Sequence, residues 1–138
     1  MTQLQNSQRK WHLIDLDGQT YGRELSRAAN LLCGKHKTSF SKNLDQGDYV
    51  VIINASKAKF TGQKLSQKTY YKHTGYLGNL KEISLEKSMK LSAANTIKKS
   101  IGGMLPKNKM GRRMLRNLRV FADSKHDLDA QQPIAVKI

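Results

Sequence analysis

The first half of the chain alternates short apolar runs with one amphipathic segment. Residues 10–16 alternate in polarity and end at an Asp-Gly turn dipeptide, which predicts a strand. Apolar side chains then recur at helical spacing over residues 25–32, and Gly34 stands where a helix end favours glycine. Residues 48–55 form a continuous apolar run rich in β-branched side chains, which is typical of a strand buried on both faces of a parallel sheet. The pattern predicts a β-α-β unit.

The second half of the chain contains one segment without a regular polarity pattern and two segments with helical spacing. Residues 56–80 interleave lysines with aromatic side chains and follow neither period, which predicts an extended ribbon or a long loop. Residues 84–101 carry an apolar stripe at helical spacing, and a glycine pair followed by a proline predicts where that helix ends. A helical wheel over residues 109–117 separates methionines and leucine from lysine and arginines, which predicts an amphipathic helix. Residues 118–122 predict a short strand returning to the sheet.

Length and composition fit one folded domain. A chain of 138 residues with 38% hydrophobic residues can bury a core without a metal or a disulfide. We therefore predict an α/β domain over residues 10–122, an N-terminal tail over residues 1–9 and a polar C-terminal tail over residues 123–138.

The charge is strongly positive and unevenly placed. The chain has 25 Lys and Arg against 10 Asp and Glu, a net charge of +15. Residues 87–122 alone hold 10 of these cations and no acidic residue. A solvated cationic face is the simplest alternative, but ten uncompensated cations favour binding to a polyanion. The amphipathic segment at 109–117 would supply Lys and Arg for phosphate contacts.

Tyrosines beside lysines favour RNA as that polyanion. In residues 68–76, exposed rings could stack on unpaired bases while lysines meet phosphates. We expect one of Tyr70 and Tyr71 to pack on the sheet and the other to face outward. Lys35 and Lys37 follow a predicted helix end, so they could instead complement the helix dipole. The charge alone fits DNA as well, but the chain lacks helix-turn-helix, zinc-finger and basic-zipper patterns.

Enzymatic and metal-binding patterns are weak. The chain has neither the GxxxxGK[ST] nor the GxGxxG spacing of nucleotide sites. Cys33 and His36 have the spacing of half a zinc site without a second pair, so we expect Cys33 in the core. His12, His36, His73 and His126 are spread over the chain, and we expect them to have no neighbouring carboxylates. We predict no catalytic, cofactor-binding or metal-binding residue and no cofactor.

Cysteine content and hydropathy indicate the cellular compartment of the protein. A single cysteine suits a reducing compartment, no apolar run reaches the roughly 18 residues of a membrane span, and the opening residues resemble neither a signal nor a transit peptide. These features predict a cytoplasmic protein without membrane contact.

Several long motifs together resemble one family, the large-subunit ribosomal protein L13 family. They are "WHLIDLDGQTYGR", "LLCGKHKTSF", "DQGDYVVIINASKAKFTGQKL", "KTYYKHTGYLGNLK", "IGGMLPKNKMGRRMLRNLRVF" and "DAQQP", in family order from Trp11 to Pro133. The resemblance implies a three-layer α/β/α domain around a small parallel sheet, with basic extended loops. It also implies a non-enzymatic role in which the protein binds large-subunit ribosomal RNA (rRNA) and supports subunit assembly. The family usually has a proline near residue 92, which this chain lacks.

The predicted partners are large-subunit rRNA and neighbouring ribosomal proteins, without homo-oligomer formation. The location is the cytoplasmic ribosome, with an organellar ribosome as the alternative. A free RNA-binding regulator of a messenger and a small nucleotide-dependent enzyme are the competing functions. The residues assigned to RNA binding are Lys35, His36, Lys37, Lys57, Lys59, Lys64, Lys68, Tyr71, Lys72, His73, Lys107, Asn108, Lys109, Arg112, Arg113 and Arg116.

Overall fold

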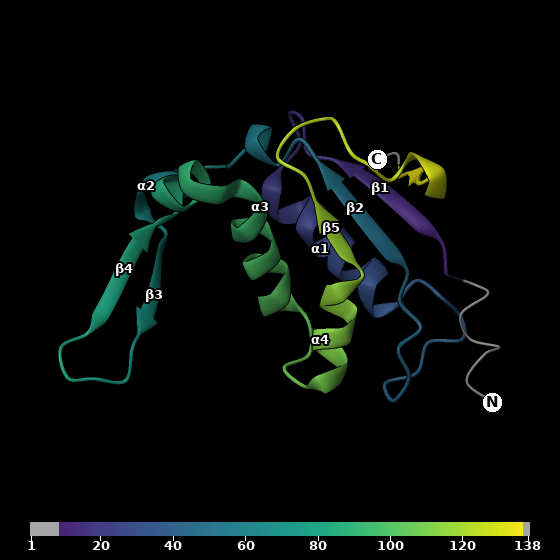
Figure 1. The fold of residues 1–138 in the computed structure, drawn as a ribbon, viewed down its shortest axis with the longest axis horizontal. Coiled ribbons are helices and arrows are strands. Elements are labelled where there is room, and N and C mark those ends of the chain that lie inside the picture. Colours follow the sequence, from purple (N-terminus) through teal and green to yellow (C-terminus); the bar gives the residue numbers. More distant parts are fainter. Residues whose placement is uncertain (1–8, 137–138) are drawn as a thin grey trace.

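Four parallel strands form the centre of the protein, whose computed structural model describes residues 9–136 (Figure 1). They lie in the order β5-β2-β1-β6. The strands are β1 (Trp11–Asp15), β2 (Tyr49–Ile53), β5 (Leu118–Val120) and β6 (Ile134–Ala135). The prediction of a single α/β domain around a small parallel sheet is confirmed.

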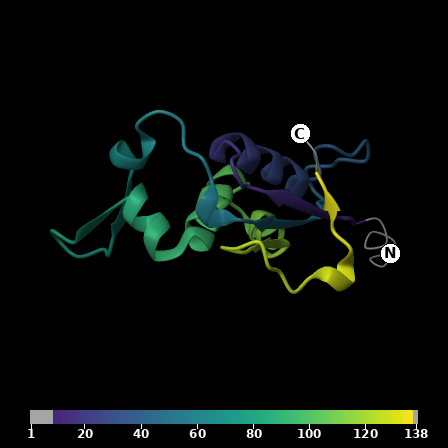
Figure 2. The same ribbon diagram turned by 90° about the horizontal axis from the view of Figure 1, so that it is seen from above.

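One face of the sheet carries the main hydrophobic core. Val50 and Ile52 of β2 lie opposite Leu118 and Val120 of β5, so their side chains share a face. Three helices contribute buried side chains to this core: α1 (Tyr21–Cys33), α3 (Leu85–Met104) and α4 (Lys109–Arg116). Figure 2 shows α1 on one side of the sheet and the C-terminal connection with its short helix η3 (Asp129–Gln131) on the other. Val51 and Ile53 are also buried, which confirms that β2 is covered on both faces.

The predicted end of the first helix is confirmed. Gly34 follows α1 with φ of 76°, and its N–H donates to the Leu31 carbonyl at 3.1 Å. The left-handed conformation suits glycine because a side chain is strained there. A Cβ at this position would also lie 2.9 Å from the carbonyl oxygen of Gln46.

Helix α3 differs from its prediction in length and in shape. It continues through the glycine pair to Met104, so the predicted end at residue 101 is wrong; Leu105 and Pro106 end it instead. Ser92 interrupts it with φ −164° and ψ 99°. The Ser92 hydroxyl accepts the Asn95 N–H at 3.3 Å, so it caps the second half of the helix.

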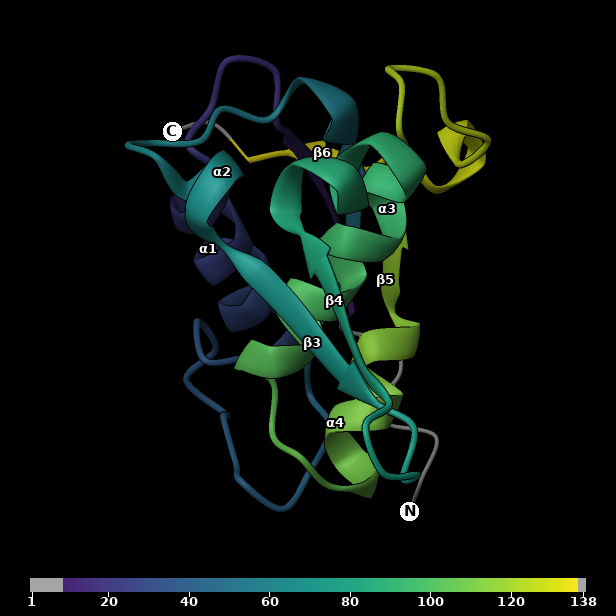
Figure 3. The same ribbon diagram turned by 90° about the vertical axis from the view of Figure 1, so that its left-hand side faces the viewer.

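The segment predicted as a ribbon or loop, residues 56–80, contains regular elements. They are η2 (Ala55–Lys57), α2 (Lys64–Gln67) and β3 (Thr69–His73), which pairs antiparallel with β4 (Leu80–Ser84). The β3-β4 hairpin projects from one side of the molecule, apart from the parallel sheet (Figures 1 and 3). It packs on the body through α2 and α3.

The C-terminal segment returns to the sheet. Residues 134 and 135 form β6 and pair with His12 and Leu13 of β1. The sequence pattern does not predict strand β6. Of the predicted N-terminal tail, residues 1–8 lie outside the described residues. Within residues 9–136, no helix combines the length and apolar character that crossing a lipid bilayer requires.

Candidate nucleic-acid interface

Helix α4 presents a cationic face because its apolar face is used for packing. Met114 is 3% exposed and belongs to the core, whereas Arg112, Arg113 and Arg116 are exposed. Asn108 starts the helix, since its Oδ1 accepts the Gly111 N–H at 2.9 Å. The predicted amphipathic helix is confirmed, and its end lies at Arg116 with Asn117 as the cap.

Gly111 allows α4 to lie against the preceding loop. A Cβ at this position would lie 1.8 Å from the carbonyl oxygen of Pro106, which belongs to backbone and cannot rotate away. Only glycine fits this contact, so residue 111 fixes how the basic helix is held.

Replacing Gly111 with alanine should destabilise the protein by about 1–3 kcal/mol, because the backbone must shift to relieve the overlap. Urea unfolding followed by circular dichroism measures this change. Gly103→Ala is the matched control: it is another helical glycine, and a Cβ there meets nothing within 4 Å. The control should unfold at the same urea concentration as wild type or a higher one. Equal stability of the Gly111→Ala protein and wild type would contradict the close approach.

Cations from three elements meet in a shallow depression of about 450 Å³, which we call the cationic cleft. Lys98 comes from α3, Arg112 and Arg116 from α4, and Arg119 from β5, and Leu115 and Leu118 complete the lining. Within residues 9–136, the Lys and Arg side chains that form salt bridges are Arg9, Arg27, Lys37, Lys57 and Lys90. The cleft therefore concentrates four positive charges that form no salt bridge with any residue in the described part of the chain.

Two residues of the cationic cleft are not among the RNA-binding residues predicted from the sequence. Arg112 and Arg116 were assigned to RNA binding, but Lys98 and Arg119 were not. Arg119 lies between buried Leu118 and Val120 on β5, so the alternation of a strand turns it to the other face. That alternation was a usable signal for Arg119. The acid-free range contains Lys98, but only the packing of α3 on α4 and β5 brings it to the cleft.

The hairpin carries a second group of cations. Lys72 of β3 lies directly opposite Lys81 of β4, and both are exposed. Like charges at opposite positions repel each other and destabilise a strand pair, so a bound anion would stabilise this one. Tyr71 is 61% exposed, whereas the Tyr70 hydroxyl lies 3.3 Å from the Ser100 hydroxyl of α3. One tyrosine is packed and one faces outward as expected, but the packing partner is α3 and not the sheet.

Two of the assigned residues contact a buried carboxylate. Asp48 is fully buried, and its side chain interacts with Lys37, with His36 at 3.0 Å and with His12 at 3.0 Å. Burial acts to raise the pKa of Asp48, but the hydrogen bonds from Lys37, His12 and the Lys10 N–H, with the charge of Lys37, outweigh it and hold the pKa below its ordinary value. The expectation that histidines lack neighbouring carboxylates is wrong here.

The cluster of His12, His36 and Asp48 also has the residue types that bind metal ions. One ligand atom each from His12, His36 and Asp48 lies within 4.8 Å of the others. However, the Lys37 ammonium already contacts the same carboxylate and supplies the positive charge that a metal ion would bring. Cys33 is buried in the core, as expected.

The remaining assigned residues lie on several separate surfaces. Lys107 and Asn108 lie with Arg112 around a small depression at the start of α4, and Lys35 and Asn108 line a neighbouring one. Lys59, Lys64 and Lys68 line a deeper cavity beside α1 and α3. Four other assigned residues are exposed and line none of these depressions. Lys57 pairs with Asp17 at 3.4 Å, His73 lies on the hairpin, and Lys109 and Arg113 lie on α4.

Comparison with known proteins identifies the family. A family model described as ribosomal protein L13 matches residues 9–127. The chain belongs to the ribosomal protein L13 family. A large ribosomal subunit protein uL13 from Alkalilimnicola ehrlichii is 47% identical over 126 residues, covering 91% of this chain and 89% of the relative. A protein of the same name from Vesicomyosocius okutanii is 48% identical over 130 residues, covering 94% and 92%.

Membership of the L13 family confirms two predictions. The resemblance noted in the sequence is correct, and the protein is a structural component of the ribosome and not an enzyme. The relative from Thermobifida fusca, also named large ribosomal subunit protein uL13, is 45% identical over 131 residues and covers 95% of this chain. The L13 match spans all the elements of the sheet and helices up to β5.

Proposed function

We propose that this protein binds large-subunit rRNA through the cationic cleft and the cationic face of α4, and that this binding supports assembly of the large subunit. The cleft carries the proposal, because Lys98, Arg112, Arg116 and Arg119 meet there and none of its described lining residues is acidic. Asp127 lines an adjoining depression with Lys98 and Arg119 but forms no salt bridge with either within the described residues. Arginine forks and lysine ammonium groups at one surface suit contact with successive phosphates of a folded backbone.

The footprint extends from the cleft to neighbouring cations. Lys107 and Asn108 lie next to Arg112 at the start of α4, and Lys109 and Arg113 lie on the same helix. The hairpin adds Lys72, Lys81, His73 and the exposed ring of Tyr71, which suits stacking on an unpaired base. Lys35 extends the footprint beside Asn108 at the start of α4, while His36 and Lys37 mainly hold Asp48 and bring Lys35 into place.

The hairpin also provides a surface for neighbouring ribosomal proteins. Tyr76 and Leu77 at its tip are 76% and 102% exposed, and Leu80 is 52% exposed. A two-stranded hairpin with exposed apolar side chains gains stability when another surface covers it. We propose that a neighbouring protein of the large subunit covers this tip in the cytoplasmic ribosome.

Sedimentation of the tagged protein in cell lysate tests the proposal. At low salt the protein should travel with the large subunit, and depletion of the protein should shift large-subunit particles to slower-sedimenting precursors. Recovery mainly with messenger RNA, away from large subunits, would contradict the proposal and favour a free regulator. A normal large-subunit peak after depletion would contradict the assembly role alone.

A further inference from the structure

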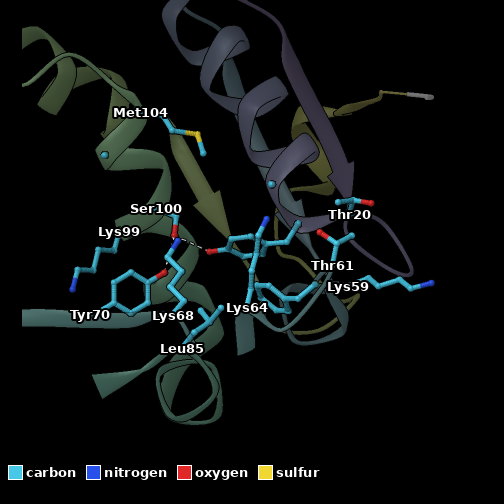
Figure 4. A pocket seen from close by; sticks show the side chains of 14 residues that line it. Thr20, Lys59, Thr61, Lys64, Lys68, Tyr70, Leu85, Lys99, Ser100 and Met104 are labelled. Atoms are coloured by element: carbon cyan, nitrogen blue, oxygen red, sulfur yellow. Dashed lines mark hydrogen bonds between the residues drawn. The ribbon is translucent and has the colours of Figure 1, made fainter. Parts of the chain in front are cut away.

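A cavity of about 430 Å³ lies between α1, the segment before α2, β3 and the second half of α3 (Figure 4). Its wall is largely aromatic and aliphatic. The rings of Tyr21 and Phe60 lie with their centroids 4.5 Å apart, and Leu85 and Met104 complete the apolar lining. Its volume lies in the range of about 300–1,000 Å³ that is usual for ligand pockets.

Lysines surround this apolar cavity. Lys59, Lys64, Lys68 and Lys99 line it, and none of the described residues in its lining is acidic. Figure 4 shows Lys59 at one end and Lys99 at the other, with Lys64 and Lys68 between them. The ammonium groups of Lys68 and Lys99 lie 5.3 and 4.6 Å from the centre of the Tyr70 ring. A flat apolar group carrying negative charges would match both the wall and the rim.

Three hydroxyl groups in the cavity wall are already close enough to hydrogen-bond with one another. The Ser100 hydroxyl lies 2.8 Å from the Tyr21 hydroxyl and 3.3 Å from the Tyr70 hydroxyl. Burial raises the pKa of Tyr21 to about 12, although its hydrogen bond with Ser100 opposes this, so the ring stays neutral beside an anion. The cavity therefore offers a ligand mainly apolar surface and lysine ammonium groups.

We propose that this cavity holds one unpaired nucleotide of the bound RNA, with its base against Tyr21 and Phe60 and its neighbouring phosphates against the surrounding lysines. The proposal rests on the proposed function and names one part of the RNA that the protein recognises. Stacking on aromatic rings accepts any base, so the site should tolerate changes in base identity.

Two observations favour a nucleotide within an RNA chain over a free nucleotide. Cations lie at both ends of the cavity, which suits a backbone that enters at one end and leaves at the other. Sites for nucleoside triphosphates commonly bind Mg²⁺ through carboxylates, whereas the lining residues include no carboxylate.

Two glycines in the lining allow a sharp test. A Cβ at Gly22 of α1 or Gly103 of α3 meets nothing within 4 Å, so Gly22→Leu and Gly103→Leu can fill the cavity from opposite sides without changing charge. Each should weaken binding to in vitro transcribed large-subunit rRNA by roughly ten- to a hundredfold, the usual range for losing one stacked base. The salt dependence of binding should stay unchanged, because no phosphate contact is removed.

Asn30→Leu is the matched control, since it places the same side chain at an exposed position of α1 outside the cavity. It should bind rRNA like wild type, and all three variants should keep the thermal midpoint of wild type or exceed it. A second measurement uses rRNA containing 4-thiouridine: ultraviolet crosslinking should attach nucleotides to peptides containing Tyr21 or Phe60, and Gly103→Leu should abolish this attachment.

The results of these experiments distinguish failure of the cavity proposal from failure of the proposed function. Wild-type affinity of both filled variants for rRNA would overturn the cavity proposal while leaving the cationic cleft untouched. Tight binding of AMP, CMP, GMP or UMP, with rRNA affinity unaffected by filling, would replace it with a free-nucleotide site. Failure of the wild-type protein to bind rRNA at all would contradict both the proposed function and the cavity proposal.

Discussion

Replacing the four cations of the cationic cleft with glutamine should weaken binding to large-subunit rRNA roughly a hundredfold at low salt. Lys98, Arg112, Arg116 and Arg119 are solvent-facing or half-buried around one depression, so their loss removes charge with little effect on the core. Each phosphate contact contributes about 0.9 to the slope of log affinity against log salt for a duplex. The slope should therefore become shallower by about 3 to 4.

A control that removes three exposed cations elsewhere separates the effect of the cleft from the effect of the protein's net charge. Arg23, Lys87 and Lys125 are exposed cations outside the cleft and form no salt bridge within the described residues. Replacing these three with glutamine should change the slope by less than about 1. Equal slopes for the cleft variant and wild type would remove the cleft from the RNA footprint.

Asp48→Asn should lower the free energy of unfolding by about 3 kcal/mol, the usual cost of breaking a buried ion pair by removing one partner. Asp48 is fully buried, and Lys37 with a side chain 19% exposed would lose its anion while His12 and His36 lose their shared acceptor. Urea unfolding at neutral pH measures the difference. Asp17→Asn is the control, because Asp17 pairs with Lys57 on the surface and should contribute less than about 1 kcal/mol.

The difference in unfolding free energy between wild type and Asp48→Asn should also depend on pH, in a direction set by the lowered pKa of Asp48. The folded-state pKa of Asp48 is lowered from its ordinary value of 3.8, so the stability it contributes is present above that value and is lost as the pH falls through the folded pKa. The gap in unfolding free energy between wild type and Asp48→Asn should therefore narrow below pH 3.8. A gap that widens as the pH falls through this range would contradict the lowered pKa.

The sequence predicted those elements whose own residues determine them. The apolar run of β2 has only one stable environment, between two covered faces, and Gly34 can end α1 because of its backbone freedom. The amphipathic pattern of α4 likewise identified both its buried and its cationic face. Local pattern and tertiary packing agree in all three cases, which is why the predictions are confirmed.

The elements that the sequence did not predict depend on distant partners. Strand β6 is two residues long and forms because β1 offers it an open edge. Strand β4 carries charged and apolar side chains without a buried face of its own, so only its pairing with β3 reveals it. Tertiary contacts decide both, and a local pattern cannot contain them.

Tertiary contacts also explain why some residues of the candidate site could not be predicted from the sequence. His12, His36 and Asp48 come from three separate segments and meet where β1 and β2 begin. Lys98 and Arg119 are 21 positions apart in the sequence and share a cleft only because α3 packs beside β5. The total charge could be counted from the sequence, but its focus on one cleft required the fold.

A cryo-electron microscopy map of the large subunit containing this protein tests the central claim most directly. The map should show rRNA phosphates within about 4 Å of the side-chain nitrogens of Lys98, Arg112, Arg116 and Arg119, the distance expected for ion pairs. Density that leaves these four side chains in bulk solvent within an intact particle would contradict the account.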